Sequence, residues 1–151
     1  MKLGLISDTH GLLRPEAVVA LRGCELILHA GDIGNADVLR GLAALAPVIA
    51  VRGNNDVGAW ARVLPDSEMV TADGRQLHLL HDIKDLALDP VTAGIHAVIS
   101  GHSHKPSVER RDGVLFINPG SAGPRRFKLP VSLARLTIEN GLIEARIIPL
   151  A

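Results

Sequence analysis

Short aliphatic runs of strand length constrain the fold of this chain more than any other feature of its sequence. Near-continuous apolar runs without polar alternation are typical of strands buried on both faces of a sheet. Polar side chains follow each run directly. Because parallel strands present their carboxyl ends at one edge of a sheet, these polar side chains are expected to meet there. The runs are residues 3–7, 26–30, 48–51 and 97–100.

The polar residues at these strand ends are of types that bind metal ions, namely carboxylates, imidazoles and an amide. Asp8 and His10, like His102 and His104, are spaced by two residues, which in an extended chain places both side chains on one face. Glycine precedes Asp32, Asn54 and His102, where it allows a sharp turn or a close approach of another segment. The predicted ligands are Asp8, His10, Asp32, Asn54, His81, His102 and His104.

The first half of the chain alternates predicted strands and helices, the pattern of β-α-β units with a parallel sheet. Pro15 suits a first helical turn, and Pro47 follows the end of a second helix. The second half is predicted to form hairpins, because Asp-Gly and Asn-Gly pairs separate its strands. Two packed sheets with helices outside would satisfy both halves. The predicted helices are 15–22, 35–45 and, more weakly, 85–92, and the strands are 2–6, 25–30, 48–51, 68–71, 75–80, 96–100, 107–111, 114–117, 131–138 and 142–148.

The length of the chain fits one domain, residues 1–151, which can bury a core without disulfides. Lys plus Arg and Asp plus Glu both number 16, so no long-range field attracts nucleic acid or an anionic membrane. Cys24 is the only cysteine, which excludes an intramolecular disulfide and a thiolate zinc cluster. With no run of membrane-spanning length and no signal-peptide core, the cytoplasm is the expected location.

The ligand types favour a centre of two divalent ions. A carboxylate has two oxygens and can bridge two ions, and Asp32, alone in its cluster, is the candidate bridge. Imidazole and oxygen donors without thiolate suit Mn, Fe, Zn, Co or Ni better than Ca or Mg, and we favour manganese. Such ions can convert a bridging water to hydroxide, which attacks a phosphoester in line without a serine or cysteine nucleophile. We assign catalytic contributions to Asp32, Asn54 and His81.

Five ordered motifs together resemble the calcineurin-like metallophosphoesterase superfamily, and the short length looks like its small YfcE-like phosphodiesterase branch. The resemblance covers the whole chain and implies an α/β fold, a four-layer αββα sandwich of two mixed sheets flanked by helices. It further implies one metal on Asp8, His10, Asp32 and His104, and another on Asp32, Asn54, His81 and His102. The motifs are Asp8-x-His10, Gly31-Asp32-x-x-Asn35, Gly53-Asn54-x-Asp56, His81 and Gly101-His102-x-His104, followed by Asn118-Pro119-Gly120-Ser121.

Two positions depart from the family pattern. Larger relatives carry histidine after the motif asparagine, where this chain has Asn55, and an amide cannot act as a general acid near neutral pH. Asp82 follows His81, where many relatives have glycine. Outside the motifs, His29, His78 and His96 are interpreted as structural. Arg125, Arg126 and Lys128 either meet substrate phosphate or form a solvated surface.

The leading hypothesis is a metal-dependent phosphodiesterase acting on small phosphodiesters through the metal-bridging hydroxide. The resemblance supplies the diester class, whereas the residues indicate only phosphoester hydrolysis. The alternatives are a phosphomonoesterase and a non-catalytic binding scaffold, since a retromer subunit shares this fold. Intact residues at all ligand positions argue against the scaffold. We expect no membrane partner and no specific nucleic acid, and a homo-oligomer is left open.

Overall fold

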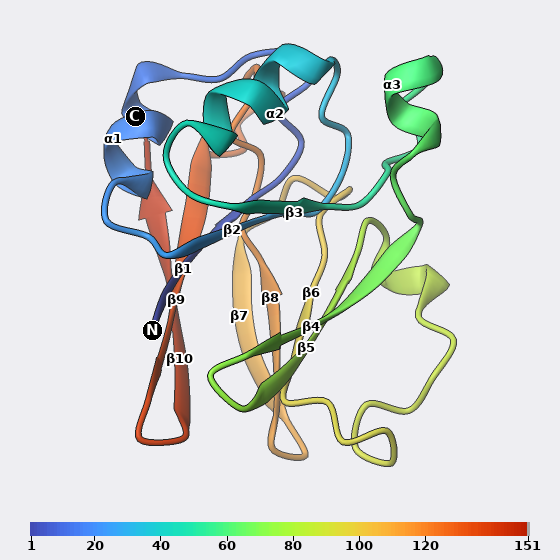
Figure 1. Cartoon of the computed structure of the whole chain (residues 1–151), viewed down its shortest axis with the longest axis vertical. Helices are drawn as coiled ribbons and strands as arrows, with labels where there is room; N and C mark the ends of the chain where they lie inside the picture. Colours follow the sequence, from blue (N-terminus) through green and yellow to red (C-terminus); the bar gives the residue numbers. More distant parts are fainter. Residues whose placement is uncertain (151) are drawn as a thin grey trace.

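The computed structural model describes residues 1–150, which form two mixed five-stranded sheets packed face to face (Figure 1). The strand order is β10-β9-β1-β2-β3 in the first sheet and β4-β5-β6-β8-β7 in the second. These sheets confirm the predicted sandwich. The strands are β1 Lys2–Ile6, β2 Leu26–His29, β3 Val48–Ala50, β4 Ser67–Ala72, β5 Arg75–Leu80, β6 Ala97–Ile99, β7 Ser107–Arg111, β8 Val114–Asn118, β9 Ser132–Glu139 and β10 Leu142–Pro149.

The first sheet contains the predicted β-α-β units. β1 pairs in parallel with β2, and β2 in parallel with β3, through the helices α1, Pro15–Leu21, and α2, Ala36–Ala43. Pro15 occupies the first turn of α1, as expected. Asn35 caps α2, because its side-chain oxygen accepts the Val38 N–H at 3.2 Å. The β9–β10 hairpin then extends this sheet in the antiparallel direction.

Strand side chains alternate between two cores. Leu3 and Leu5 of β1 pack between the sheets against residues such as Leu79 of the second sheet. Ile6 and Ile27 face the other way and pack against α1 and α2. Strands buried on both faces therefore explain why the sequence runs are almost wholly aliphatic.

The outer face of the second sheet has a thinner cover than the first. The predicted helix at 85–92 is wrong: this segment contains only the end of a 3-10 turn, η1, Ile83–Asp85, and a loop. Asp89 accepts hydrogen bonds from the Val91 N–H and the Thr92 hydroxyl, which favours a turn over a helix at Pro90. A short helix that was not predicted, α3, Ala59–Arg62, follows β3. No helix among the described residues is long and apolar enough to cross a membrane.

Candidate metal centre

The structure brings the predicted ligands together from five strand ends. Asp8, Asp32 and Asn54 follow β1, β2 and β3 of the first sheet, whereas His81 and His102 follow β5 and β6 of the second. The carboxyl ends of parallel strands in both sheets thus meet at one edge of the sandwich. Candidate groups of metal-binding side chains lie there, one containing Asp8, His10 and His104 and the other Asp32, His81 and His102.

The backbone at these ligands is not extended. Asp8, His10, Asp32, His102 and His104 all have φ between 46° and 71°, in the left-handed region. The expectation that each i, i+2 pair shares one face of an extended chain is therefore wrong, because the chain turns at each of these residues. Non-glycine residues in this region are held there by their surroundings, and such strain is concentrated at functional sites.

Two motif glycines are needed because other ligand-bearing loops pack against them. A Cβ atom at Gly53 would overlap the backbone and carboxylate of Asp32. A Cβ atom at Gly101 would lie 2.6 Å from Asp8 Oδ2 and would overlap Ser7. The structure thus contains the close approach that was expected at these glycines. At each of them, a loop that follows one strand packs against a ligand-bearing loop that follows another strand.

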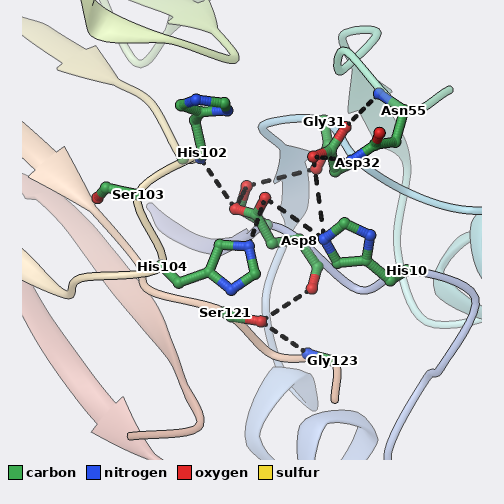
Figure 2. Close-up of polar contacts among 12 residues, drawn as sticks. Asp8, His10, Gly31, Asp32, Asn55, His102, Ser103, His104, Ser121 and Gly123 are labelled. Atoms are coloured by element: carbon green, nitrogen blue, oxygen red, sulfur yellow. Dashed lines mark hydrogen bonds and ion pairs between the residues drawn. The ribbon is translucent and has the colours of Figure 1, made fainter. Parts of the chain in front are cut away.

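The first group surrounds Asp8, which is fully buried (Figure 2). Asp8 Oδ2 accepts hydrogen bonds from the Ser7 hydroxyl at 2.7 Å and from the His102 backbone N–H at 3.1 Å. Asp8 Oδ1 lies 3.3 Å from His104 Nε2 and 3.9 Å from His10 Nε2. In residues 1–150, Asp8 Oδ1 and His10 Nε2 are buried without a hydrogen-bond partner. Burial raises the pKa of Asp8 above its ordinary value, and a bound cation would favour the ionised form.

The second group is built around His81. Its Nδ1 lies 2.7 Å from the Ala30 carbonyl oxygen, which can only accept, so Nδ1 carries the proton. The lone pair of Nε2 in the neutral ring then faces Asn54 Oδ1 at 2.9 Å and Asp32 Oδ2 at 3.2 Å. His102 Nδ1 completes the cluster, 3.2 Å from Asn54 Oδ1. A cation is the natural occupant of a space that so many acceptor atoms face.

Positive charge is favoured in this second group. Without a metal ion, it is the protonated ring, and not the neutral one, that can donate its Nε2–H to Asp32. Burial by itself would lower the pKa of His81, but hydrogen bonding to Asp32 and to the Ala30 carbonyl raises it above its ordinary value. Asp32 shows the complementary effect. Burial alone would raise the pKa of its carboxyl group, yet hydrogen bonds from His81 and from the Asn55 N–H lower that pKa to about 2. Ionised Asp32 therefore stabilises a cation beside it.

Asp32 lies between the two groups, as its proposed bridging role requires. Its Oδ2 is 3.9 Å from His10 Nε2 of the first group and 3.2 Å from His81 Nε2 of the second. Asn55, which stands where larger relatives carry histidine, also contacts this carboxylate. Its backbone N–H donates to Oδ1 at 2.9 Å and its side-chain amide donates to Oδ2 at 3.2 Å. Figure 2 shows Asn55 joined to Asp32, and Asp32 in turn joined to His10.

His29 supports the ligand-bearing loops without facing the centre. The ring is fully buried; its Nδ1 accepts the Gly31 N–H at 3.1 Å and its Nε2–H donates to Thr9 Oγ1 at 3.0 Å. The Thr9 hydroxyl in turn donates to the Ile33 carbonyl at 2.9 Å. Burial lowers the pKa of His29 to about 3, so the ring is neutral near pH 7. The structural interpretation agrees with these contacts, although sequence reasoning did not reveal the link between two ligand loops. A histidine within a buried aliphatic strand was the available signal.

Other sequence candidates support the loops or lie away from the centre. Asn118 donates to the Gly101 carbonyl at 3.0 Å, and Ser121 donates to the Asp8 carbonyl at 2.9 Å, so the motif that contains both residues supports two ligand-bearing loops. His96 Nδ1 accepts the Gln76 N–H at 3.0 Å, which agrees with a structural role.

A cleft of about 670 Å³ opens beside the second group. Asn54, His81 and His102 line this cleft, so a molecule bound in it could contact the candidate centre directly. Arg52 also lines the cleft, but its guanidinium is paired with Asp66 at 2.7 Å. The remaining polar wall is mainly acidic or neutral and includes His78, Asp82 and Asp85.

Both a protein-family model and a named relative match nearly the whole chain. Residues 1–141 match the model of the calcineurin-like phosphoesterase superfamily domain. A protein of Methanothermobacter thermautotrophicus named a probable metallophosphoesterase is 36% identical over 160 residues, covering 98% of this chain and 92% of its own. These matches extend through every predicted ligand motif.

Solved structures share the fold. A novel archaeal phosphodiesterase superposes with a TM-score of 0.81 at 26% identity, over 98% of this chain and 100% of its own. YfcE, a phosphoesterase from E. coli, gives 0.71 at 26% identity over 100% of both chains. Vps29 of Chaetomium thermophilum gives 0.79 at 17% identity over 99% of this chain and 96% of its own, which shows the fold alone.

Proposed function

The chain belongs to the calcineurin-like phosphoesterase superfamily, and from this premise we propose that it hydrolyses small phosphodiesters at a centre of two divalent ions. The observation that carries the proposal is the set of buried polar atoms around Asp8 and His10 that have no hydrogen-bond partner among the described residues. Buried polar groups ordinarily have partners, and a cation would supply one here. The acceptor cluster around His81 supports a second ion next to the first.

The residues present fit the two ions that this family implies. Imidazole, carboxylate and amide donors without thiolate favour manganese, with iron, zinc, nickel and cobalt as alternatives. Two such ions would acidify a water molecule and stabilise the attacking and departing oxygens of an in-line displacement. In this proposal one ion is held by Asp8, His10, Asp32 and His104, and the other by Asp32, Asn54, His81 and His102.

Other groups near the site orient these ligands or lie away from them. The Ser7 hydroxyl is engaged by Asp8, and Cys24 packs in the core beneath the helices. The Ala30 carbonyl fixes the His81 tautomer, which keeps the Nε2 lone pair directed at the second position. These contacts support direct attack by water rather than a covalent enzyme intermediate.

The cleft favours a diester over a monoester. A monoester carries a second negative charge near neutral pH, whereas the cleft presents the carboxylates of Asp82 and Asp85 and a guanidinium already paired with Asp66. A diester carries one charge, and its second ester group would fill part of the 670 Å³ cleft. Ligand-type residues are present at every predicted position, which supports catalysis over the alternative of a non-catalytic binding scaffold.

Metal content and paired substrates test the proposal. We expect purified protein reconstituted with Mn²⁺ to hold two ions per chain and to hydrolyse bis-p-nitrophenyl phosphate faster than p-nitrophenyl phosphate. A reversed preference would favour a phosphomonoesterase. Reconstituted protein that holds no metal and hydrolyses neither ester would favour the scaffold. A cytoplasmic location remains a prediction from the sequence.

A further inference from the structure

Asp82, which directly follows His81, lies between the short turn η1 and the candidate centre. It caps η1, because its Oδ1 accepts the Lys84 backbone N–H at 3.1 Å. Its other oxygen, Oδ2, lies 3.6 Å from Nε2 of His102, which is within ion-pair range but longer than a hydrogen bond. The cap therefore holds one oxygen of the carboxylate and leaves the other facing His102.

His102 needs such a partner more than the other histidines of the centre. Its side chain is 45% exposed, compared with 7% for His81 and 6% for His104, so packing alone does not fix its ring. The ring is nevertheless oriented: Nδ1 lies 3.2 Å from Asn54 Oδ1 and 3.3 Å from His81 Nε2. The two nitrogens of His102 thus face different neighbours, one the candidate centre and the other Asp82.

A histidine that binds a metal through one nitrogen ordinarily donates its other N–H to a carboxylate or carbonyl, which fixes the tautomer and the ring. The Ala30 carbonyl serves His81 in this way. Among residues 1–150, Asp82 is the acceptor placed to serve His102. We propose that Asp82 is a positioning residue that accepts the His102 Nε2–H, directs the Nδ1 lone pair at the second metal position and thereby sets the affinity for that ion. This inference rests on the proposed two-ion function.

The proposal makes the two metal positions unequal. Asp8, at the first, is buried and held by Ser7 and by the His102 backbone. The second metal position includes the exposed ring of His102, whose orientation depends on the neighbouring Asp82 carboxylate. Loss of such an outer partner typically lowers metal affinity 10- to 100-fold, so removal of the Asp82 carboxylate should weaken the second ion while the first changes little.

Calorimetric titration of the metal-free protein with Mn²⁺ measures both affinities. Asp82→Asn and Asp82→Ser keep an oxygen that can cap η1, so the turn should be retained in either variant. We expect both to bind the first ion within about twofold of wild type and the second about 10- to 100-fold more weakly. Asp85→Asn is the matched control, because Asp85 ends the same turn and lines the same cleft without contacting a predicted ligand in the described chain. It should bind both ions within about twofold of wild type.

A double-mutant cycle with His102→Ala tests whether Asp82 acts through His102. In the His102→Ala background, Asp82→Asn should cause no further loss of affinity.

In zinc-loaded wild-type protein, nuclear magnetic resonance should show a slowly exchanging His102 Nε2–H that is lost in Asp82→Asn. Wild-type affinity in both Asp82 variants, or an equal loss in Asp85→Asn, would overturn the proposal, as would a further loss in the His102→Ala background. If one of these results is found while wild-type protein binds two ions and cleaves diesters, only the role given to Asp82 is wrong. If wild-type protein binds no second ion, the two-ion proposal is wrong as well.

Discussion

The backbone N–H of His102 donates a hydrogen bond to Asp8 Oδ2 at 3.1 Å, although 94 residues separate the two in the chain. Asp8 belongs to the first group of predicted ligands and His102 to the second. The bond therefore ties the loop after β6 to the loop after β1 (Figure 2). This one bond links the two metal positions, so the loss of Asp8 itself should be felt at the second position.

Asp8→Ala should consequently weaken both ions, although Asp8 is assigned as a ligand of only one. We expect the first ion to be lost and the affinity for the second to fall at least about tenfold, since the loop that carries His102 loses its anchor. His10→Ala, which removes a first-position ligand without this link, should leave the second affinity within about threefold. Manganese titration of the two variants makes the comparison, and an unchanged second affinity in Asp8→Ala would contradict the coupling.

Asn55 should limit turnover of esters with poor leaving groups. Its amide is engaged with Asp32 and cannot donate a proton to a departing alkoxide near neutral pH. Rates across a series of aryl and alkyl phosphodiesters should therefore fall steeply as the pKa of the leaving group rises. Asn55→His should change this slope more than it changes KM. A flat dependence, with chemistry shown to limit the rate, would indicate another acid at the site.

His29 should make the metal-free protein less stable in acid. Burial lowers the pKa of His29 from 6.5 to about 3, so below pH 6.5 the unfolded chain takes up a proton that the folded ring refuses. This contribution is fully present above pH 6.5 and is lost as the pH falls toward 3, with a slope of at most about 1.4 kcal/mol per pH unit. Urea unfolding of wild type and His29→Gln between pH 7 and about pH 4 should show a shallower fall in the variant. If stability falls equally steeply with pH in both proteins, His29 is not the cause of the loss of stability in acid.

Gly53→Ala should disrupt the centre more than the rest of the fold. The added methyl group would overlap Asp32, displacing the carboxylate that lies between the two groups. We expect the affinity for both ions to fall more than about tenfold. Gly74→Ala is the control: its turn also disfavours a side chain, with φ of 76°, but an added Cβ meets nothing within 4 Å. It should cost about 1 kcal/mol of stability without altering metal binding. Equal metal affinities in the two variants would refute the role given to Gly53.

The sequence predicted the strands well because their aliphatic runs report burial directly. Leu3 and Leu5 face one core while Ile6 faces the other, so β1 could be recognised from its own residues without knowing which strands lie next to it. The segment at 85–92 lacked such a signal. There the side chain of Asp89 bonds to nearby backbone and side-chain donors, and this local preference prevailed over the weak helical pattern.

The candidate centre was predictable in composition but not in geometry. Ligand types at strand ends indicated which residues would meet, and the structure brings them together. Their left-handed backbone could not be foreseen, because it is imposed by contacts such as that between Asp8 and the loop of His102. The pairing of Asn55 with Asp32 and of Asp82 with His102 likewise depends on segments distant in sequence.

The central claim is that two ions flank Asp32, and anomalous scattering from crystals of the Mn²⁺-reconstituted protein tests it most directly. We expect two manganese peaks roughly 3.5–4 Å apart, with the Asp32 carboxylate in contact with both and the other ligands divided between them as assigned. A single peak, or two peaks that do not share Asp32, would contradict the account.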